Sequence, residues 1–281
     1  MKVEFKKYIF PGVSNFDPAQ TFDCGQCFRW TEEGDGSWTG VAGNNVANVK
    51  TVPSECGCSD KVDVIVEGTG TEEFWRNYLD LDADYGAMSE ALTEGEPETM
   101  PKACCAGHGI RILRQDLWEA TLDFIISQNN NIPRIRGCIE NLSKKFGKPL
   151  GEFRGKERYG LPAPETLASL SREDLAEIHL GYRDEYIIKT AALWPNMTDE
   201  EKKAHLIDLP GIVPKVESCI RLFGLHEMES FPIDVWVARL MHWFYGFEEK
   251  DKKGMKCFAE EKFGDLAGLA QQYLFYYIRG L

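Results

Sequence analysis

The first part of the chain alternates hydrophobic and polar positions with the period of two that is typical of half-buried β-strands. The run KVDVIVEG (61–68) shows this alternation, and DGSWTGVAGNNVANVKTV (35–52) sets Gly and Asn turn signals among β-branched and aromatic residues. Such runs, bounded by turn residues, predict antiparallel strands joined by short connections. We therefore expect residues 1–70 to consist mainly of strands and turns.

The hydrophobic pattern changes to a helical period at Glu72. In EEFWRNYLDLDADYGAMSEAL (72–92), apolar residues recur three and four positions apart, as on the buried face of a helix. The next segment, TEGEPETMPKACCAGHG (93–109), carries Gly and Pro and predicts a loop. Beyond this loop we expect the chain to be helical.

Capping residues mark the helix boundaries expected in the second half. A short polar residue followed three positions later by Glu predicts a capping box, Pro suits a first helical turn, and Gly ends helices. The predicted starts are Asp116 with Glu119, Pro133, Ser171 with Asp174, and Thr198 with Glu201, and the predicted ends of the second and third helices are Gly147 and Gly181.

These patterns together predict an α+β fold with two domains. We expect an N-terminal antiparallel β-domain over residues 1–105, with a helix near 72–92, and a mostly α-helical domain over residues 106–281. The second domain would contain a helix–hairpin–helix motif at about 198–224. Its parts would be a helix over Thr198–Leu206, a tight hairpin over Asp208–Val213 and a second helix that begins at Pro214.

Lys215 is the most unusual residue of this motif. It follows Pro214 in LPGIVPKVESC (209–219) and therefore lies at the positive end of a helix dipole, where a cation is disfavoured. Partial burial and the dipole both favour the neutral amine, which can act as a nucleophile. A solvent-facing lysine remains the alternative, because most helix lysines only face water.

Asp234 follows nineteen residues later in FPIDVW (231–236). It comes after a proline turn and can cap the next helix, VWVARLMHWFYG (235–246). A helix and a return loop would bring it back toward Lys215, where a carboxylate can stabilise positive charge and assist proton transfer. The alternative is an Asp that only caps its helix.

Net charge argues at first against a nucleic-acid partner. The formal charge is −13, whereas basic patches are the usual footprint of nucleic-acid binding. The charge is uneven, however. Residues 1–103 hold 8 Lys/Arg and 19 Asp/Glu, a net −11, while residues 129–160 hold 8 Lys/Arg and 3 Asp/Glu, a net +5. Local charge governs docking, so this segment is either a binding surface or a solvated helix face.

The remaining composition is that of an ordinary soluble protein, 43% hydrophobic and 27% charged. No apolar run is long enough for a membrane span, and MKVEFKKYIFPGV (1–13) is too charged for a secretory signal. We expect a cytoplasmic protein with reduced thiols. Cys24 and Cys27 form a C-x-x-C that could be a redox or zinc pair, but no second C-x-x-C completes a zinc site, and the pairs Cys56/Cys58 and Cys104/Cys105 have poor ligand spacing.

A hairpin of the form LPG-x-x-x-K, followed after nineteen residues by a Pro-x-Asp loop, resembles the helix–hairpin–helix superfamily of base-excision DNA glycosylases. Four further stretches resemble its 8-oxoguanine DNA glycosylase/AP lyases in particular, and the similarity runs from about Thr21 to Phe275. These stretches are DCGQCFRW (23–30), SQNNNIPRI (127–135), LGYRDEY (180–186) and AGLAQQYLF (267–275).

The resemblance implies a role for each matching position. Lys215 would attack C1′ of the damaged nucleotide and form a Schiff base, and Asp234 would stabilise the transition state. The flipped base would lie between Phe275 and Cys219, with Phe223 beside it. Gln271 would read the Watson–Crick edge. The Gly25 carbonyl would accept the N7–H that 8-oxoguanine has and guanine lacks.

A second set of matching residues would replace the flipped base. Asn129 would fill the gap in the duplex, Tyr182 would wedge the stack, and Arg134 with Arg183 would bind the orphaned cytosine. Arginine donors suit the O2 and N3 acceptors of cytosine, so we expect excision to be preferred opposite C. Without the resemblance, NNN (129–131) indicates only a polar helix end and turn.

Gly211, Val213 and Trp236 match the family's DNA-phosphate contacts, but two of them depart from the usual pattern. The family usually has a second glycine at position 213, and valine resists positive φ. Vertebrate members carry a histidine at position 236. The resemblance also implies no cofactor: a cation at the hairpin is compatible with it, but only Cys257 lies beyond Cys219, so we expect no iron–sulfur cluster.

The sequence thus favours a monomeric enzyme of bacteria or archaea that acts near the nucleoid on double-stranded DNA containing 8-oxoguanine. Two alternatives stay open. One is a related glycosylase for other damaged bases, which would not need Gly25, Gln271 and Phe275 together. The other is a non-catalytic helix–hairpin–helix DNA-binding protein, in which Lys215 and Asp234 would be incidental.

Overall fold

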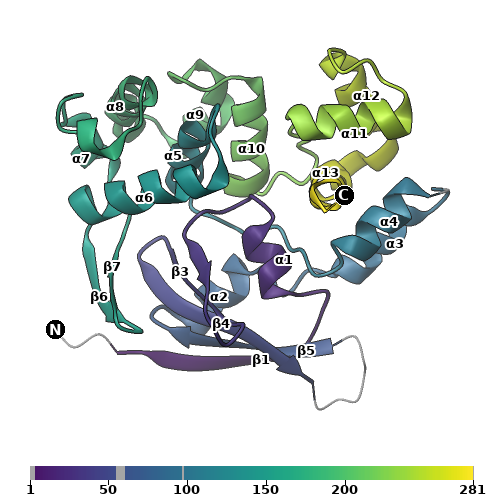
Figure 1. The fold of residues 1–281 in the computed structure, drawn as a ribbon, viewed down its shortest axis with the longest axis horizontal. Coiled ribbons are helices and arrows are strands. Elements are labelled where there is room, and N and C mark those ends of the chain that lie inside the picture. Colours follow the sequence, from purple (N-terminus) through teal and green to yellow (C-terminus); the bar gives the residue numbers. More distant parts are fainter. Residues whose placement is uncertain (1–3, 55–60, 97, 281) are drawn as a thin grey trace.

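The structure, a computed structural model, describes residues 4–54, 61–96 and 98–280. Cys56 and Cys58 lie outside the described residues. The sheet lies at one end of the molecule and the later helices cover the other end, with helix α1 between them (Figure 1). The α+β class expected from the hydrophobic pattern is confirmed.

The N-terminal sheet has five antiparallel strands in the order β1-β5-β4-β3-β2. The alternating run 61–68 and the run 35–52 form its centre, and Val66 of the first pairs with Val49 of the second. A register shift between Phe10 and Val13 accommodates the Pro-Gly pair of the first strand. The strands are β1 (Lys6–Ser14), β2 (Trp30–Glu32), β3 (Trp38–Ala42), β4 (Asn45–Pro53) and β5 (Lys61–Gly68).

A core of aromatic residues joins the sheet to two short helices, α1 (Pro18–Asp23) and α2 (Glu72–Tyr78). The Phe22 ring stacks on Trp30 with the ring centres 4.0 Å apart, and Trp75 meets Trp30 edge-on. Helix α1 was not predicted from the sequence. It is six residues long, and Asp17 caps it by accepting a hydrogen bond from the Gln20 N–H.

The helical part follows the sheet. Residues 72–92 form two helices rather than one continuous helix, and a hairpin interrupts a segment that was expected to be helical. The elements are α3 (Tyr85–Thr93), α4 (Thr99–Ala106), α5 (Leu117–Ser127), α6 (Ile132–Phe146), β6 (Pro149–Phe153), β7 (Lys156–Tyr159), α7 (Pro164–Ala168), α8 (Arg183–Leu193), α9 (Asp199–Ala204), α10 (Pro214–Gly224), α11 (Val235–Tyr245), α12 (Lys252–Phe263) and α13 (Ala267–Arg279).

Two local predictions are wrong. The expected loop over 93–109 contains α4, because Met100, Ala103 and Cys104 lie on one helix face and are buried in the helical core. Proline at position 101 is tolerated since it falls in the first turn. Ser171 and Asp174 do exchange hydrogen bonds, but only a 3₁₀ turn over Ala176–Ile178 follows them.

The other capping predictions can be compared directly. Thr198 and Glu201 form the predicted capping box at α9, although this helix ends at Ala204 and a 3₁₀ turn continues to Asp208. Asp116 caps α5, but Glu119 does not reciprocate. Its carboxylate instead accepts a hydrogen bond from the Gly43 N–H and lies 3.7 Å from Arg29, inside the molecule.

Candidate active site

Lys215 is the second residue of α10, and Val213 is the N-cap. Val213 has φ −106° and ψ 164°, an extended conformation that suits valine, so the lack of glycine at this position introduces no backbone strain. Its side chain does not cap the helix. The first amides of α10 are therefore left without a side-chain acceptor of the usual kind, which is the arrangement that binds anions at helix N-termini.

The turn before α10 is held against two other helices. Gly211 has φ +82°, and a Cβ atom there would lie 2.6 Å from the Tyr186 ring, so only glycine fits. Its carbonyl accepts a hydrogen bond from Gln128 Nε2 at 2.9 Å, and the Pro210 carbonyl accepts one from Thr190. These contacts fix the hairpin relative to the end of α5 and to α8.

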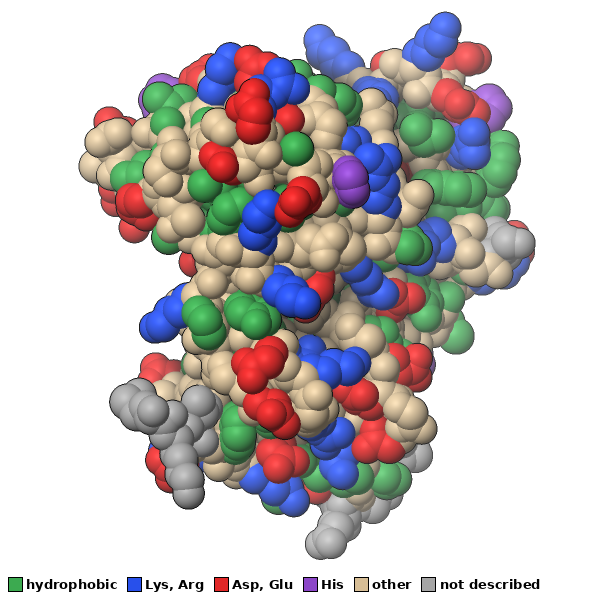
Figure 2. Space-filling model, turned by 60° about the vertical axis from the view of Figure 1, so that its left-hand side comes forward, with side chains coloured by type: hydrophobic (Ala, Val, Ile, Leu, Met, Phe, Trp, Pro, Cys, Tyr) green, Lys and Arg blue, Asp and Glu red, His purple; other side chains and the backbone are tan. Residues whose placement is uncertain are grey.

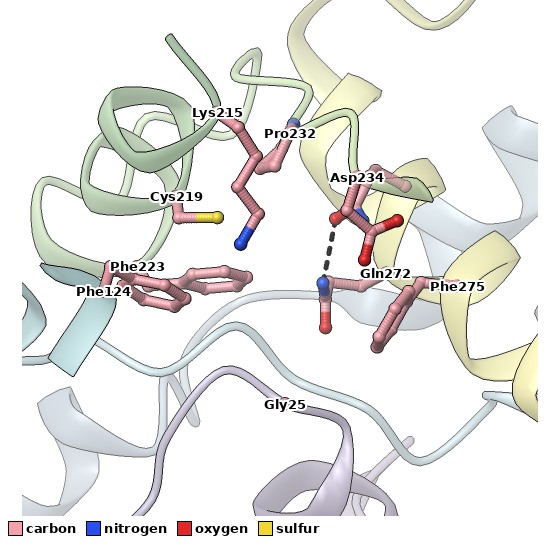
Figure 3. Close-up of a pocket in the computed structure, with 10 residues that line it drawn as sticks. Gly25, Phe124, Lys215, Cys219, Phe223, Pro232, Asp234, Gln272 and Phe275 are labelled. Carbon is pink, nitrogen blue, oxygen red and sulfur yellow. Dashed lines mark hydrogen bonds between the residues drawn. The ribbon is translucent and has the colours of Figure 1, made fainter. Parts of the chain in front are cut away.

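Asp234 caps α11, as predicted, and its Oδ1 accepts a hydrogen bond from the Val237 N–H at 2.8 Å. It also lines the same pocket as Lys215. Figure 3 shows both side chains reaching into the space between α10 and α13 from opposite sides. One aspartate thus serves as a helix cap and lines the pocket that Lys215 enters, so its two interpretations from the sequence are compatible.

Gly25 enters the pocket on a loop between α1 and β2, and has φ +88°. The neighbouring Gln26 is fully buried and anchors this loop. Its Nε2 donates to the carbonyls of Thr21 and Arg111 at 2.8 Å, and its Oε1 accepts from the Leu113 N–H. A Cβ atom at Gly25 would lie 3.4 Å from the Phe275 ring, so the loop approaches this wall closely.

Aromatic rings and a thiol form the remaining walls. The Phe124 and Phe223 rings stack with their centres 5.3 Å apart, and Lys215 Nζ lies 5.4 Å from the Phe124 ring centre. Burial raises the pKa of the Cys219 thiol, while the charge of Lys215 lowers it. The thiol therefore stays uncharged, as suits an apolar wall. The complete lining is Gly25, Phe124, Lys215, Cys219, Phe223, Pro232, Asp234, Gln271, Gln272 and Phe275.

All seven residues expected for catalysis and the base pocket meet in this one pocket, and three lining residues were missed. Phe124, Pro232 and Gln272 complete it. The doublet in AGLAQQYLF was a signal for Gln272, because two adjacent glutamines on a buried helix need polar partners. The space between the walls is about 40 Å³.

The four residues expected to replace a flipped base form a second cluster, where α5 ends and α8 begins. Asn129 has φ +46°, which asparagine tolerates, and its amide lies 3.4 Å from the Tyr182 hydroxyl. Arg183 is buried and donates to the carbonyls of Gln128, Asn129 and Leu180. Exposed Arg134 donates to the His179 carbonyl. Gln128 links this cluster to the hairpin.

A second cleft adjoins the pocket and shares Lys215 with it. Its volume is about 550 Å³, its floor includes Phe231 and Ile233, and the exposed lysines 252, 253 and 256 of α12 lie along it. Trp236, on the first turn of α11, is 46% exposed and stacks on the Arg239 guanidinium at 5.3 Å. Cationic and aromatic side chains of this kind suit a nucleic-acid backbone.

Some basic side chains of the segment 129–160 are engaged in ion pairs, and others are exposed. Arg136 pairs with Asp23, Lys145 with Glu177 and Arg154 with Asp35. Arg134 and the lysines 144, 148 and 156 are exposed. Figure 2 shows basic side chains near the waist between the helical part and the sheet, and many acidic ones over the sheet. The charge is thus uneven in space as well as along the sequence.

Both members of the C-x-x-C pair, Cys24 and Cys27, are buried. Burial raises the pKa of the Cys24 thiol to about 12 and that of Cys27 well above its usual value. Both cysteines are therefore buried, protonated thiols rather than exposed thiolates. Over residues 4–54, 61–96 and 98–280, no group of three or more His, Cys, Asp or Glu is arranged to hold a metal, and no helix is long and apolar enough to cross a membrane.

Comparison with known proteins identifies the family. Residues 9–121 match the N-terminal domain of 8-oxoguanine DNA glycosylases, and residues 122–264 match the HhH-GPD superfamily of base excision DNA repair proteins. The crystal structure of the Clostridium acetobutylicum 8-oxoguanine glycosylase/lyase in its apo-form is 38% identical over 98% of each chain, with a TM-score of 0.86. The chain belongs to the 8-oxoguanine DNA glycosylases.

Other members of the family agree with this assignment. The structure of MBOgg1 in complex with a low-affinity DNA ligand is 39% identical, covers 100% of this chain and 99% of that one, and has a TM-score of 0.88. The N-glycosylase/DNA lyase OGG1 of Arabidopsis thaliana is 28% identical over 91% of this chain and 75% of its own. The chain is therefore an enzyme of base excision repair. The two regions that match the family models, 9–121 and 122–264, together span nearly all of the chain.

Proposed function

We propose that this 8-oxoguanine DNA glycosylase excises 8-oxoguanine from duplex DNA with Lys215 as the nucleophile, and then cleaves the strand at the abasic site. The observation that supports this most strongly is the single pocket that Lys215 and Asp234 enter from two helices. The aromatic rings, the glycine loop and the glutamines of the same pocket are suited to hold a planar base.

The first step replaces one bond at C1′ with another. The Lys215 amine attacks C1′, the bond from C1′ to N9 breaks, and the base leaves with the bonding electrons and takes up a proton. Positive charge develops on the sugar as this bond breaks. The Asp234 carboxylate faces that region and stabilises the charge, as fixed charges in a partly dry site do.

The second step uses the same lysine. Proton transfer and ring opening convert the C1′ adduct into a Schiff base, whose positive nitrogen acidifies the C2′ hydrogens. A general base removes one C2′ proton, and the 3′ phosphate leaves with the electrons of its C–O bond. This β-elimination nicks the strand 3′ to the lesion.

Base recognition depends on the loop that Gln26 anchors. The Gly25 carbonyl accepts the N7–H of 8-oxoguanine. Guanine offers only a lone pair at N7, so it would leave the buried carbonyl unpaired and repel it. Phe275 and Cys219 hold the faces of the base, and Gln271, 3% exposed, reads the Watson–Crick edge.

The Asn129 cluster holds the opposite strand. Asn129 and Tyr182 lie together at the surface and occupy the gap left by the flipped base. Arg134 is exposed and binds the orphaned cytosine through its O2 and N3 acceptors. Arg183 joins it by exchanging one of its carbonyl partners for the base.

DNA docks through local features because the whole chain is acidic. The amides of the first turn of α10 and the turn at Gly211 receive a phosphate of the damaged strand, and Trp236 packs on the backbone beside it. The protein acts as a monomer. Because docking depends on local contacts with phosphates, its affinity for DNA falls as salt rises.

A strand-cleavage assay tests this function. Duplexes carry a labelled strand with 8-oxoguanine or guanine opposite cytosine, and products are resolved with and without alkali. We expect the 8-oxoguanine strand to be nicked without alkali and the guanine strand to stay intact. Equal cleavage of both strands would contradict the proposed recognition, and base release that needs alkali to nick the strand would contradict the lyase step.

A further inference from the structure

Two adjacent glutamines on α13 form a hydrogen-bonded pair in the wall of the pocket. Gln272 Nε2 donates to Gln271 Oε1 at 2.8 Å, and each side chain is only 3% exposed. This bond fixes the orientation of the Gln271 amide, because its oxygen is already engaged. The amide nitrogen of Gln271 then remains the group available to a ligand.

The oxygen of Gln272 has no partner. Gln272 Oε1 is buried and accepts no hydrogen bond from any described residue. Of the buried side-chain atoms left unpaired in the described residues, it is the one that belongs to a lining residue of the pocket. Figure 3 shows the Gln272 amide extending into the pocket, with its oxygen pointing away from the bond to Gln271. An unpaired buried acceptor is costly, so a donor is expected to complete it.

We propose that Gln272 is a second base-reading residue, whose Oε1 accepts an N–H of the Watson–Crick edge of the flipped base. This inference rests on the proposed function, since it assumes that a base occupies the pocket. The pair also presents two complementary groups to such a base, because Gln271 offers a donor and Gln272 an acceptor side by side.

A guanine-type edge matches this donor and acceptor, whereas an adenine-type edge does not. 8-Oxoguanine presents the O6 acceptor beside the N1–H donor. 8-Oxoadenine presents an amino donor beside the N1 acceptor, so both contacts would meet like groups. The two bases share the N7–H and the 8-oxygen, so the glycine loop cannot tell them apart. The glutamine pair thus selects the guanine-type ring.

The test compares both bases, each opposite cytosine, in the wild type and in Gln272→Met, which has a similar shape and no amide. The ratio of variant to wild-type single-turnover rate is taken for each base, so differences in base pairing cancel. Cleavage of a preformed abasic site, which contains no base, is the third substrate. Gln272→Asn, which keeps an amide on a shorter side chain, is the second variant in case Gln272→Met does not fold. Thermal unfolding shows whether each variant is folded.

We expect Gln272→Met to lower 8-oxoguanine excision by at least roughly tenfold, because it removes the acceptor for the base and also the donor that orients Gln271, and to lower 8-oxoadenine excision little. The rate of 8-oxoguanine excision by Gln272→Asn should lie between those of the wild type and Gln272→Met. The inference would be overturned if the excision rates of both bases fell by the same factor. It would also be overturned if both variants cleaved the abasic site more slowly by that factor, because Gln272 would then only shape the pocket. A wild type that excises 8-oxoguanine from no duplex would instead overturn the proposed function.

Discussion

Lys215 and Asp234 reach one pocket from the first turns of two different helices, α10 and α11. A hairpin held by Gln128 positions the first helix, and the Asp234 carboxylate itself caps the second. The chemistry therefore depends on two helix starts that the fold fixes independently. Substitutions can separate the catalytic part of each residue from its structural part.

Asp234→Asn should reduce excision without unfolding the protein. Asparagine caps helices as well as aspartate does, so the bond to the Val237 N–H can be kept. The charge that stabilises the transition state is lost, and we expect excision of 8-oxoguanine to fall by about 10²–10³-fold. Single-turnover kinetics and thermal unfolding measure the two effects. A rate within threefold of wild type would remove Asp234 from the mechanism.

Arg134 and Arg183 should behave differently although both are expected to bind cytosine. Arg134→Ala should reduce the preference for lesions opposite C with little change in stability, because the side chain is exposed. Arg183→Ala should also lower the free energy of unfolding by about 2 kcal/mol, since several carbonyls lose their donor. Excision from duplexes with each opposite base tests this, and equal wild-type rates opposite C and A would refute the preference.

The lysines of α12 should contribute to DNA affinity. Lys252, Lys253 and Lys256 line a cleft continuous with Lys215. Removal of each lysine that binds a phosphate should reduce the slope of log affinity against log salt concentration by about 0.9. Binding of a duplex with a stable abasic analogue is measured for the triple Gln variant over a range of salt. The control is the double variant Lys6→Gln with Lys7→Gln, which makes the same kind of substitution at exposed positions of β1. Equal salt-dependence slopes for the triple variant and this control would contradict the role of the cleft.

Buried Asp123 should make stability depend on pH. Burial and the neighbouring Glu119 raise its pKa well above the usual value, and neither carboxylate oxygen has a partner among the described residues. The folded state therefore keeps a proton that the unfolded state releases above about pH 4. Stability falls as pH rises from there toward the folded pKa, by up to about 1.4 kcal/mol per pH unit.

Asp123→Asn should remove this part of the pH dependence. The amide resembles the protonated acid in shape and cannot lose a proton in this range. Urea unfolding of both proteins between pH 5 and pH 8 gives the difference that removing the Asp123 carboxyl makes to the pH dependence. Parallel stability curves would show that Asp123 is ionised in the folded protein.

The sequence was most informative where local chemistry decides structure. The alternating run 61–68 predicted β5, and the β-branched and aromatic residues of 35–52 predicted strands where β3 and β4 lie. The Thr198–Glu201 box and Pro214 predicted helix starts at the correct positions. It failed where tertiary packing decides. Glu119 reads locally as a capping partner, yet Arg29 and Gly43, far away in sequence, bind it inside the molecule.

The pocket shows the same division. Lys215 and Asp234 stand in motifs whose spacing is visible along the chain, and Gly25 was predicted from the resemblance of DCGQCFRW to the family. Phe124 and Pro232 lie in segments that only the packing of α5, α10 and α13 brings together. Gln272 could have been noticed, but its unpaired oxygen is apparent only once the hydrogen bonds around it are known.

Borohydride trapping is the sharpest test of Lys215 as the nucleophile. The wild type and Lys215→Gln are incubated with an 8-oxoguanine duplex under sodium borohydride, which reduces a Schiff base to a stable link. We expect a covalent protein–DNA adduct attached at Lys215 in the wild type, and none in the variant although it still binds the duplex. No adduct with the wild type, or the same yield with Lys215→Gln, would contradict this mechanism.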